Sequence, residues 1–342
     1  MKKKTLIILL AISIIAISTI SCGNKKEKNH DNNIETKVVE FNDGSICTEE
    51  NGEYINYTYN NETYTECEGE EIIAVYDTES GNYLGQKNKK YIARYNGTER
   101  QLNSIEAYDS FFNLSPGGKY LSFFRNEESC NLHIMNMKED KLLTLNIEVL
   151  ISGKYVDWLD KNTIVYYGVR EADKKNGIFT YNIEQQKEKL LVEFDEGFVE
   201  FIKVINDKII YSKSSYEGEK KLISIDKDGN NQQVLASDIM KIYDIVDGNN
   251  NDYYVLGSFK NTDYALYYLK DSIHKRLTYS FPSYVDVKKG LSKGDDGNIL
   301  FIGSNNKEFQ SVYKCNDEGA VSLILDGTRE VYFVRRYSIQ NS

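Results

Sequence analysis

The sequence has few of the residues that most often carry chemistry, with three histidines and five cysteines among 342 residues. No two cysteines are separated by only two residues, which excludes a zinc knuckle or a thioredoxin-type redox motif. An HExxH zinc motif and a glycine-rich phosphate loop are also absent from the sequence. No recognisable set of nucleophile, base and metal ligands is left, and we therefore expect a protein that is not an enzyme.

One enzyme-like motif does occur, because Gly290–Gly294 fits the pattern G-x-S-x-G around Ser292. A nucleophile elbow needs a helix directly after the serine, and its catalytic histidine lies later in the chain. Here turn residues and a strand-like run follow, and His30, His133 and His274 all precede the motif. We interpret the match as chance.

Two polar turns, Asp226–Asn231 and Asp247–Asp252, have the composition of calcium-binding loops. An EF-hand loop needs an acidic residue at its twelfth position, where these two turns have Ser237 and Ser258. Hairpin turns rich in Asp, Asn and Gly explain both segments. We expect no metal site from these loops and no cofactor, with calcium as the one alternative left open.

The chain has a single long apolar run, and it lies at the start. Lys2–Lys4 precede the nearly unbroken apolar run Leu6–Ile20, which is shorter than the about 20 residues that cross a bilayer. The run ends in Thr-Ile-Ser-Cys-Gly, which resembles the lipobox of bacterial lipoproteins, except that its first position is usually leucine. The resemblance implies cleavage before Cys22 and diacylation of its thiol. Two acyl chains suffice for stable anchoring, so we expect a lipoprotein on the extracytoplasmic face of the cell membrane.

Basic residues are outnumbered, 42 against 52 acidic ones, and the net charge is −10. No basic stripe with interleaved aromatic residues appears, which excludes nucleic acid as a partner. An acidic chain is not attracted to an anionic membrane surface either. The lipid on Cys22 must therefore hold the protein at the bilayer.

Helical periodicity is absent after the apolar run, and short strand-like segments repeat instead. The predicted second strand of each repeat ends at Phe124, Gly168, Ser212, Gly257 and Gly303. The predicted third strand ends at Asn136, Asn182, Asp226, Lys270 and Cys315. Both series have the same period of about 45 residues, and such a period with four short strands per unit is typical of a β-propeller.

The best-preserved copy of the repeat is Leu114–Phe124, a Ser-Pro-Gly-Gly turn followed by a strand that starts at Tyr120. This segment resembles the repeat of TolB-like propellers, and weaker echoes follow at Val156–Asn162 and Leu291–Asn298. The resemblance covers about residues 70–326. It implies a propeller, usually of six blades, and no single activity.

We therefore predict an all-β fold, a propeller of six blades with four antiparallel strands each. Ile72–Asp77 and Lys90–Tyr95 fit the second and third strands of its first unit, and Glu330–Ser338 is expected to join the first blade and close the ring. The alternative is seven blades, with Lys37–Phe41, Tyr54–Cys67 and Glu330–Ser338 forming the additional one. The predicted segments are a signal peptide at 1–21, a flexible tether at 22–34 and the propeller at 35–342.

Four cysteines remain in the propeller. Cys47 and Cys67 flank one strand–turn–strand region and are the candidate disulfide, because an exported protein meets oxidising conditions. Cys130 and Cys315 lie in distant repeats, so their pairing stays open. Four free thiols are an equally open alternative.

One pattern recurs where the inner strand of each repeat begins, namely an aromatic residue followed by an acid. Equivalent positions in a propeller converge around the central channel, so these carboxylates could ring its mouth and attract a cation or a basic side chain of a partner. Hydrogen bonds from the acids to neighbouring turns explain the same pattern. The candidate residues are Tyr108 and Asp109, Tyr155 and Asp157, Phe198 and Glu200, Tyr243 and Asp244, and Tyr284 and Asp286.

Three functions are compatible with this sequence. The first, which we favour, is non-catalytic binding of a cell-envelope protein or peptide on one face of the propeller. The second is binding of a solute, glycan or cation at the channel mouth. The third is a metal-dependent hydrolase of the lactonase type, for which the sequence offers no converging ligand set.

Overall fold

The computed structural model describes residues 40–50, 53–68, 72–126, 130–249, 252–306 and 308–337. The predicted signal peptide and tether, with Cys22, lie outside these residues. Val39–Ser342 form one compact unit, and its strands make seven antiparallel sheets, which are the blades of a β-propeller. Among the described residues no helix is long and apolar enough to span a membrane.

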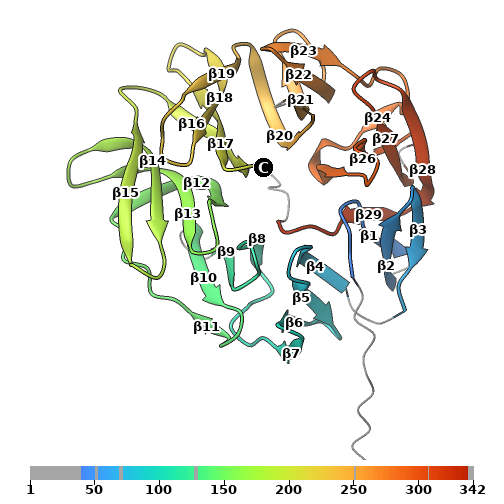
Figure 1. Cartoon of the computed structure of the whole chain (residues 1–342), viewed down its shortest axis with the longest axis horizontal. Coiled ribbons are helices and arrows are strands. Elements are labelled where there is room, and N and C mark those ends of the chain that lie inside the picture. Colours follow the sequence, from blue (N-terminus) through green and yellow to red (C-terminus); the bar gives the residue numbers. More distant parts are fainter. Residues whose placement is uncertain are drawn as a thin grey trace, which may run out of the picture. The chain divides into compact units, whose positions relative to one another are not determined.

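The blades stand around a central channel, which the innermost strand of each blade borders (Figure 1). Blades 2 to 6 each consist of four consecutive strands. Blade 2 contains β4 Ile72–Asp77, β5 Asn82–Lys87, β6 Lys90–Tyr95 and β7 Thr98–Gln101, and blade 3 contains β8 Asp109–Leu114, β9 Tyr120–Asn126, β10 Cys130–Asn136 and β11 Lys141–Leu142. Blade 4 contains β12 Val149–Trp158, β13 Thr163–Arg170, β14 Lys175–Asn182 and β15 Lys187–Glu193, and blade 5 contains β16 Phe198–Ile205, β17 Lys208–Ser214, β18 Lys220–Asp226 and β19 Gln233–Ala236. Blade 6 contains β20 Ile239–Asp247, β21 Tyr253–Phe259, β22 Ala265–Lys270 and β23 Ile273–Arg276.

Blades 1 and 7 depart from this pattern. Blade 7 has an interrupted inner edge, in which two short strands and a 3-10 turn replace one strand. Its elements are β24 Tyr284–Val285, η1 Val287–Lys289, β25 Leu291–Lys293, β26 Ile299–Ser304, β27 Gln310–Cys315 and β28 Val321–Thr328. Blade 1 combines both ends of the described chain, namely β29 Glu330–Phe333 with β1 Ile46–Glu50, β2 Glu53–Asn60 and β3 Thr63–Glu66.

The predicted repeat is confirmed in blades 3 to 7. The predicted third-strand ends are the last residues of β10, β14, β18, β22 and β27. The turn of the best-preserved copy also forms as predicted: Ser115 donates its backbone N–H to the carbonyl of Tyr120, and Gly118 donates to Ser115. Gly117 and Gly118 both have positive φ, which explains why glycine follows the proline.

The preference for six blades is wrong, and the alternative of seven is correct. Ile72–Asp77 is the inner strand of blade 2 and not a second strand, because β5 follows it and pairs with it. That unit is therefore complete by itself, and the strands between residues 46 and 66 belong to a further blade. Of the expected strand Lys37–Phe41, residues 37–39 lie outside the described residues, and Glu40 and Phe41 are not in a strand.

The ring closes as predicted, with a C-terminal strand that joins the N-terminal blade. β29 pairs antiparallel with β1 in a register that includes Ile46 opposite Phe333 and Thr48 opposite Val331. The strand ends at Phe333, however, and does not run on to Ser338. Val334–Tyr337 leave blade 1 and cross the channel (Figure 1).

The core consists of seven apolar clusters, one between each pair of neighbouring blades. Both faces of a middle strand are therefore buried. In β9, Leu121 and Phe123 pack toward blade 2, while Tyr120 and Phe124 pack toward blade 4. This two-sided burial explains why the second strands read as almost continuous apolar runs.

The predicted disulfide between Cys47 and Cys67 is not formed, and both residues are free thiols. Cys47 lies opposite Asn56 of β2, and the backbone N–H of Cys67 donates to the carbonyl of the same Asn56 on its other side. One strand thus separates the two cysteines, which places their Cα atoms about 9.5 Å apart. A disulfide tolerates about 7 Å at most. Cys315 is a buried free thiol as well, and the side chain of Cys130 lies outside the described part of the structure.

Candidate functional site

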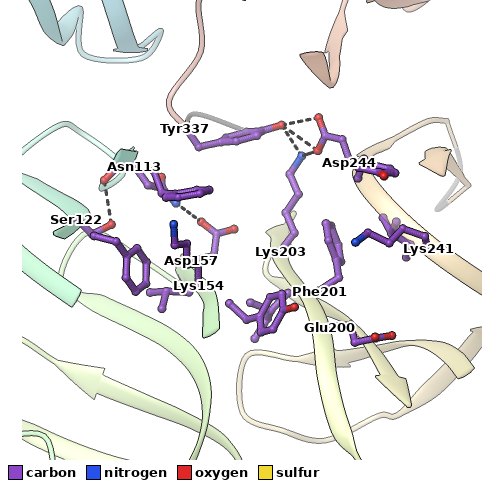
Figure 2. Close-up of a pocket in the computed structure, with 17 residues that line it drawn as sticks. Asn113, Ser122, Lys154, Asp157, Glu200, Phe201, Lys203, Lys241, Asp244 and Tyr337 are labelled. Carbon is purple, nitrogen blue, oxygen red and sulfur yellow. Dashed lines mark hydrogen bonds and ion pairs between the residues drawn. The ribbon is translucent and has the colours of Figure 1, made fainter. Parts of the chain in front are cut away.

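Four consecutive blades contribute one polar side chain each to the wall of the channel. Asn113 lies on β8, Asp157 on β12, Lys203 on β16 and Asp244 on β20 (Figure 2). Asn113 donates its side-chain amide to Asp157 over 2.8 Å, and Lys203 donates its ammonium to Asp244 over 2.6 Å. All four side chains are at least nine-tenths buried. The channel wall is therefore a set of mutually bonded polar groups.

The two aspartates tie each blade to the next. Asp157 accepts the backbone N–H of its neighbour Trp158 and that of Val204 in blade 5. Asp244 repeats this geometry two blades later, with Ile245 and with Leu291 in blade 7. Hydrogen bonds from backbone N–H groups to a carboxylate are short and strong compared with those between neutral groups. Each of the two carboxylates thus connects the inner edge of its own blade with that of the next blade by hydrogen bonds.

Asp244 is also the centre of a buried charge network. Besides Lys203, the guanidinium of Arg335 lies 3.1 Å from its carboxylate, and the hydroxyl of Tyr337 lies 3.3 Å from both oxygens. Burial alone would raise the pKa of Asp244, but Lys203 and Arg335 outweigh it and hold this pKa below its usual value. Burial likewise opposes the charge on Lys203, yet Asp244 and Tyr337 raise its pKa above the ordinary value.

A hollow of about 830 Å³, part of it open to solvent, lies at the channel mouth, and residues of this network line it. Aromatic side chains of blades 3 to 6, three lysines and Tyr337 form its walls (Figure 2). The ammonium of Lys154 lies 3.6 Å from the ring centre of Phe111, and that of Lys241 lies 5.4 Å from the ring of Tyr243. Such contacts keep a cation beside an apolar wall.

The predicted pairs of aromatic and acid residues do not all meet at this hollow. Tyr155, Asp157, Glu200, Tyr243 and Asp244 line it, and Phe198 lies two residues before Glu200 on the same strand. Glu200 forms an ion pair with Lys220 and accepts the hydroxyl of Ser214. Burial opposes the charge of Glu200, but Lys220 and Ser214 bring its pKa below the ordinary value.

Asp109 and Asp286, the first and last acids of the predicted ring in chain order, bind groups of their own blades. Asp109 is buried and binds Arg125 through both carboxylate oxygens, at 2.9 and 2.8 Å. Asp286 accepts the backbone N–H of Lys288 in the 3-10 turn and the side-chain amide of Gln310. Within the described ranges no three His, Cys, Asp or Glu side chains are grouped so that they could hold a metal ion. The five acids therefore do not form one cation site.

Three aromatic members of the pairs, Tyr108, Phe198 and Tyr284, are exposed, and all three lie on one side of the propeller. This side, called the aromatic face below, carries the loops between the fourth strand of one blade and the first of the next, and those between second and third strands. Large exposed side chains on or next to these loops are Tyr54, Tyr108, Leu150, Phe198, Tyr216, Met240, Tyr264, Tyr279, Phe281, Tyr284 and Phe309.

Ring contacts connect the rim of this face with the hollow. Phe198 lies 6.5 Å from Tyr216, and Tyr243 lies edge-on to Tyr264 at 5.5 Å. In each pair, one ring comes from an inner strand and the other from the loop between the second and third strands. Tyr216 is 74% exposed and Tyr264 is 52% exposed. In blade 6 the aromatic surface is therefore continuous from the hollow, which Tyr243 lines, to the rim.

Several residues of this site were missed by the sequence reasoning. Asn113 and Lys203 lie on inner strands, as Asp157 and Asp244 do, but they are not acids. A pattern of recurring acids therefore does not include them. Arg335 and Tyr337 lie in a segment that was assigned to a strand. Tyr216 and Tyr264 both lie in the loop between the second and third strands of their blades, and a search for aromatic residues in these loops could have found them.

Comparison with known proteins confirms the fold and reaches no further. No protein-family profile and no curated protein matches the chain. A quinonprotein alcohol dehydrogenase-like protein from Bacteroides thetaiotaomicron has a TM-score of 0.52 at 12% identity, over 84% of this chain and 78% of that one. Dipeptidyl peptidase 4 from Porphyromonas gingivalis has a TM-score of 0.50 at 14% identity, over 86% of this chain and 54% of that one.

TolB from Acinetobacter baumannii is also similar, with a TM-score of 0.46 at 9% identity over 79% of this chain and 65% of that one. TolB is thus among the structural neighbours. The chain spans about half the length of the peptidase that it resembles. At these identities the likeness shows a common propeller fold and no common activity.

Proposed function

We propose that the chain is a membrane-anchored extracytoplasmic lipoprotein whose propeller binds a protein or peptide partner without catalysis. The observation that carries this proposal is the gathering of exposed aromatic side chains on one face around the channel mouth. Tyrosine and phenylalanine are enriched in the centres of protein interfaces, and large exposed apolar patches mark binding surfaces.

The hydrogen-bond partners of the two channel aspartates favour a binding function over a catalytic one. Asp157 and Asp244 accept backbone N–H groups of two successive blades, and Asp244 also binds Lys203 and Arg335. A general base or a metal ligand needs a lone pair that faces the substrate or the ion. Both carboxylates instead face donors of the chain itself. The metal-dependent hydrolase, the third possibility from the sequence, therefore loses its candidate residues.

A capture experiment with face-selective variants tests the binding proposal. Envelope proteins are crosslinked to the full-length chain, and the yield of each partner is compared with that for the triple variant Phe198→Ser, Tyr216→Ser, Tyr264→Ser. We expect the specific partner to be lost, by tenfold or more. The matched control is Val234→Ser with Ile273→Ser, because both residues are exposed and follow loops between third and fourth strands, on the opposite side of the propeller. Equal capture by both variants would contradict the proposal.

The lipid anchor is tested separately. We expect the full-length chain to partition into the detergent phase of Triton X-114, and the Cys22→Ser variant to move to the aqueous phase. A mass increase that fits a diacylglyceryl group on Cys22 is the second expected result. Retention of Cys22→Ser in the detergent phase would show that another segment anchors the protein. A titration of the aromatic face with sugars addresses the glycan alternative.

A further inference from the structure

The segment Val334–Tyr337 makes backbone hydrogen bonds to three blades in succession. Val334 donates to the carbonyl of Ser45 in the loop before β1, over 2.8 Å. The carbonyl of Arg335 accepts the N–H of Tyr76 in blade 2, and that of Arg336 accepts the N–H of Leu114 in blade 3. The inner strand of a propeller blade is an edge strand whose free backbone groups face the channel. An extended segment that crosses the channel pairs with these groups one blade at a time.

The side chains of the same segment reach the opposite half of the ring. Arg335 binds the carboxylate of Asp244 and donates to the carbonyls of Leu291 and Lys289, at 2.6 and 2.9 Å. Two residues later, Tyr337 contacts Lys203 and Asp244 through its hydroxyl. Figure 2 shows this hydroxyl pointing at the carboxylate, with the Lys203 ammonium beside it. Residues 335 and 337 point the same way because side chains alternate along an extended chain.

Ring closure does not require these contacts. β29 alone joins the two ends of the chain through its pairing with β1. Blade 5 and blade 6 are already connected by the ion pair of Lys203 and Asp244. Val334–Tyr337 instead form an extended peptide that the channel binds from two sides. Blades 1 to 3 bind its backbone, and the carboxylate of Asp244 binds the side chain of Arg335. This combination is how proteins recognise peptides in strand form.

We propose that the central channel is a binding site for an extended peptide with an arginine two residues before a tyrosine, and that Arg335–Tyr337 occupy it in the absence of a partner. The inference rests on the proposed function, because it names the chemistry of a peptide that the propeller takes. The partner segment replaces the chain's own segment in the channel. The hollow at the channel mouth, which Tyr337 helps to line, is where the arriving segment first meets the protein.

The test uses the full-length chain and a fluorescein-labelled peptide with the sequence Phe-Val-Arg-Arg-Tyr. Its control peptide, Phe-Val-Ala-Arg-Ala, keeps the length and one arginine but lacks the two groups that contact Asp244. Binding is measured by anisotropy with wild type and with the double variant Arg335→Ala, Tyr337→Ala. The covalently attached segment competes at an effective concentration on the order of millimolar. We therefore expect the peptide to bind the double variant at least tenfold more tightly than wild type.

Three outcomes would overturn the inference: no binding to either protein, equal affinity for both proteins, or equal affinity of both peptides. If the double variant does not fold, the variant Tyr337→Phe replaces it. That variant removes only the hydroxyl contacts, and we expect at least threefold tighter peptide binding than in wild type. The residues changed here differ from those of the aromatic face. Unchanged partner capture by the aromatic-face triple variant, together with specific peptide binding in the channel, would therefore overturn the proposed face and not the channel site.

Discussion

At the scale of single residues, Asp244 is the side chain on which most contacts of the channel depend. It is 1% exposed, and its carboxylate faces two cations, a hydroxyl and two backbone N–H groups. Removing one partner of a buried ion pair destabilises the fold by much more than the intact pair stabilises it, because the other charge stays buried without compensation. The network is therefore stable only while the carboxylate is present and charged.

The first prediction follows for Asp244→Asn, which keeps the shape of the side chain and removes its charge. Lys203 and Arg335 are then buried without a counter-charge, and we expect a loss of about 3–5 kcal/mol in the free energy of unfolding. The measurement is urea denaturation. The matched control is Glu200→Gln, whose partner Lys220 is more exposed, so that a loss of about 1 kcal/mol or less is expected. Similar losses in both variants would contradict the assigned role.

The second prediction concerns pH. The pKa of Asp244 is lowered in the folded protein, so its contribution to stability is present above about pH 4, the unfolded value, and is lost as pH falls through the folded pKa. The pKa of Lys203 is raised, so its contribution is present below about pH 10.4 and is lost as pH rises through its folded pKa. We expect the free energy of unfolding of the wild type to fall at both low and high pH. For Asp244→Asn, this free energy should depend less on pH in the acid range. An unchanged acid limb would exclude this carboxylate as its source.

At the scale of elements, β29 closes the ring with one face and meets solvent with the other. Phe333 is 6% exposed and packs in the cluster between blades 7 and 1, whereas Tyr332 is 41% exposed. The third prediction is that Phe333→Ala lowers the free energy of unfolding by about 3–5 kcal/mol. Tyr332→Ala on the same strand should cost about 1 kcal/mol or less, because it loses an exposed contact with Lys289. Thermal and urea unfolding measure both, and equal costs would argue against closure by β29.

The three strands β1 to β3 keep Cys47 and Cys67 apart. A disulfide between them would close a loop of about 20 residues and stabilise the fold by about 3 kcal/mol. The fourth prediction is that dithiothreitol leaves the urea midpoint of the oxidised, purified protein unchanged. Burial raises the pKa of the Cys47 thiol to about 12, so it should also react slowly with thiol reagents at neutral pH. A lower midpoint in reductant would mean that these strands rearrange to form the bond.

The strands of blades 3 to 6 could be predicted from the sequence because both faces of their middle strands are buried. Each repeat then carries the same apolar run and the same turn, and the period becomes visible. Blade 1 could not be predicted, since it joins residues 46–66 with β29, almost three hundred residues away. Val331 looks like any strand residue until its partner Thr48 is known. Sequence reasoning finds local periods and not such distant pairings.

The candidate site was predictable to a similar degree. Asp157 and Asp244 recur at the same position of the repeat, so their convergence on the channel follows from the propeller geometry alone. Their partners do not recur. Lys203 replaces an acid in the blade between them, and Arg335 arrives from a segment outside the repeats. The charge balance of the channel, which decides between a cation site and a closed network, therefore needed the structure.

At the scale of the whole molecule, each blade is held by its two neighbours and by the channel. Seven apolar clusters fill the seven interfaces, so no blade has a core of its own. The segment Val334–Tyr337 adds contacts to blades 1, 2, 3, 5, 6 and 7. A closed ring also leaves no open interface at which unfolding could begin. We therefore expect the blades to unfold together.

The fifth prediction tests this cooperativity with the chain's only tryptophan, Trp158. It is fully buried in blade 4, where it stacks on Tyr120 and donates to the carbonyl of Asn113. Asp244 lies two blades away. If the ring unfolds as one unit, Asp244→Asn shifts the Trp158 fluorescence transition and the far-UV circular dichroism transition to the same lower urea concentration. If blades unfold separately, the Trp158 transition stays at the wild-type midpoint while the circular dichroism signal splits into two steps. Coincident shifts would establish that the channel network in blades 5 to 7 also stabilises blade 4.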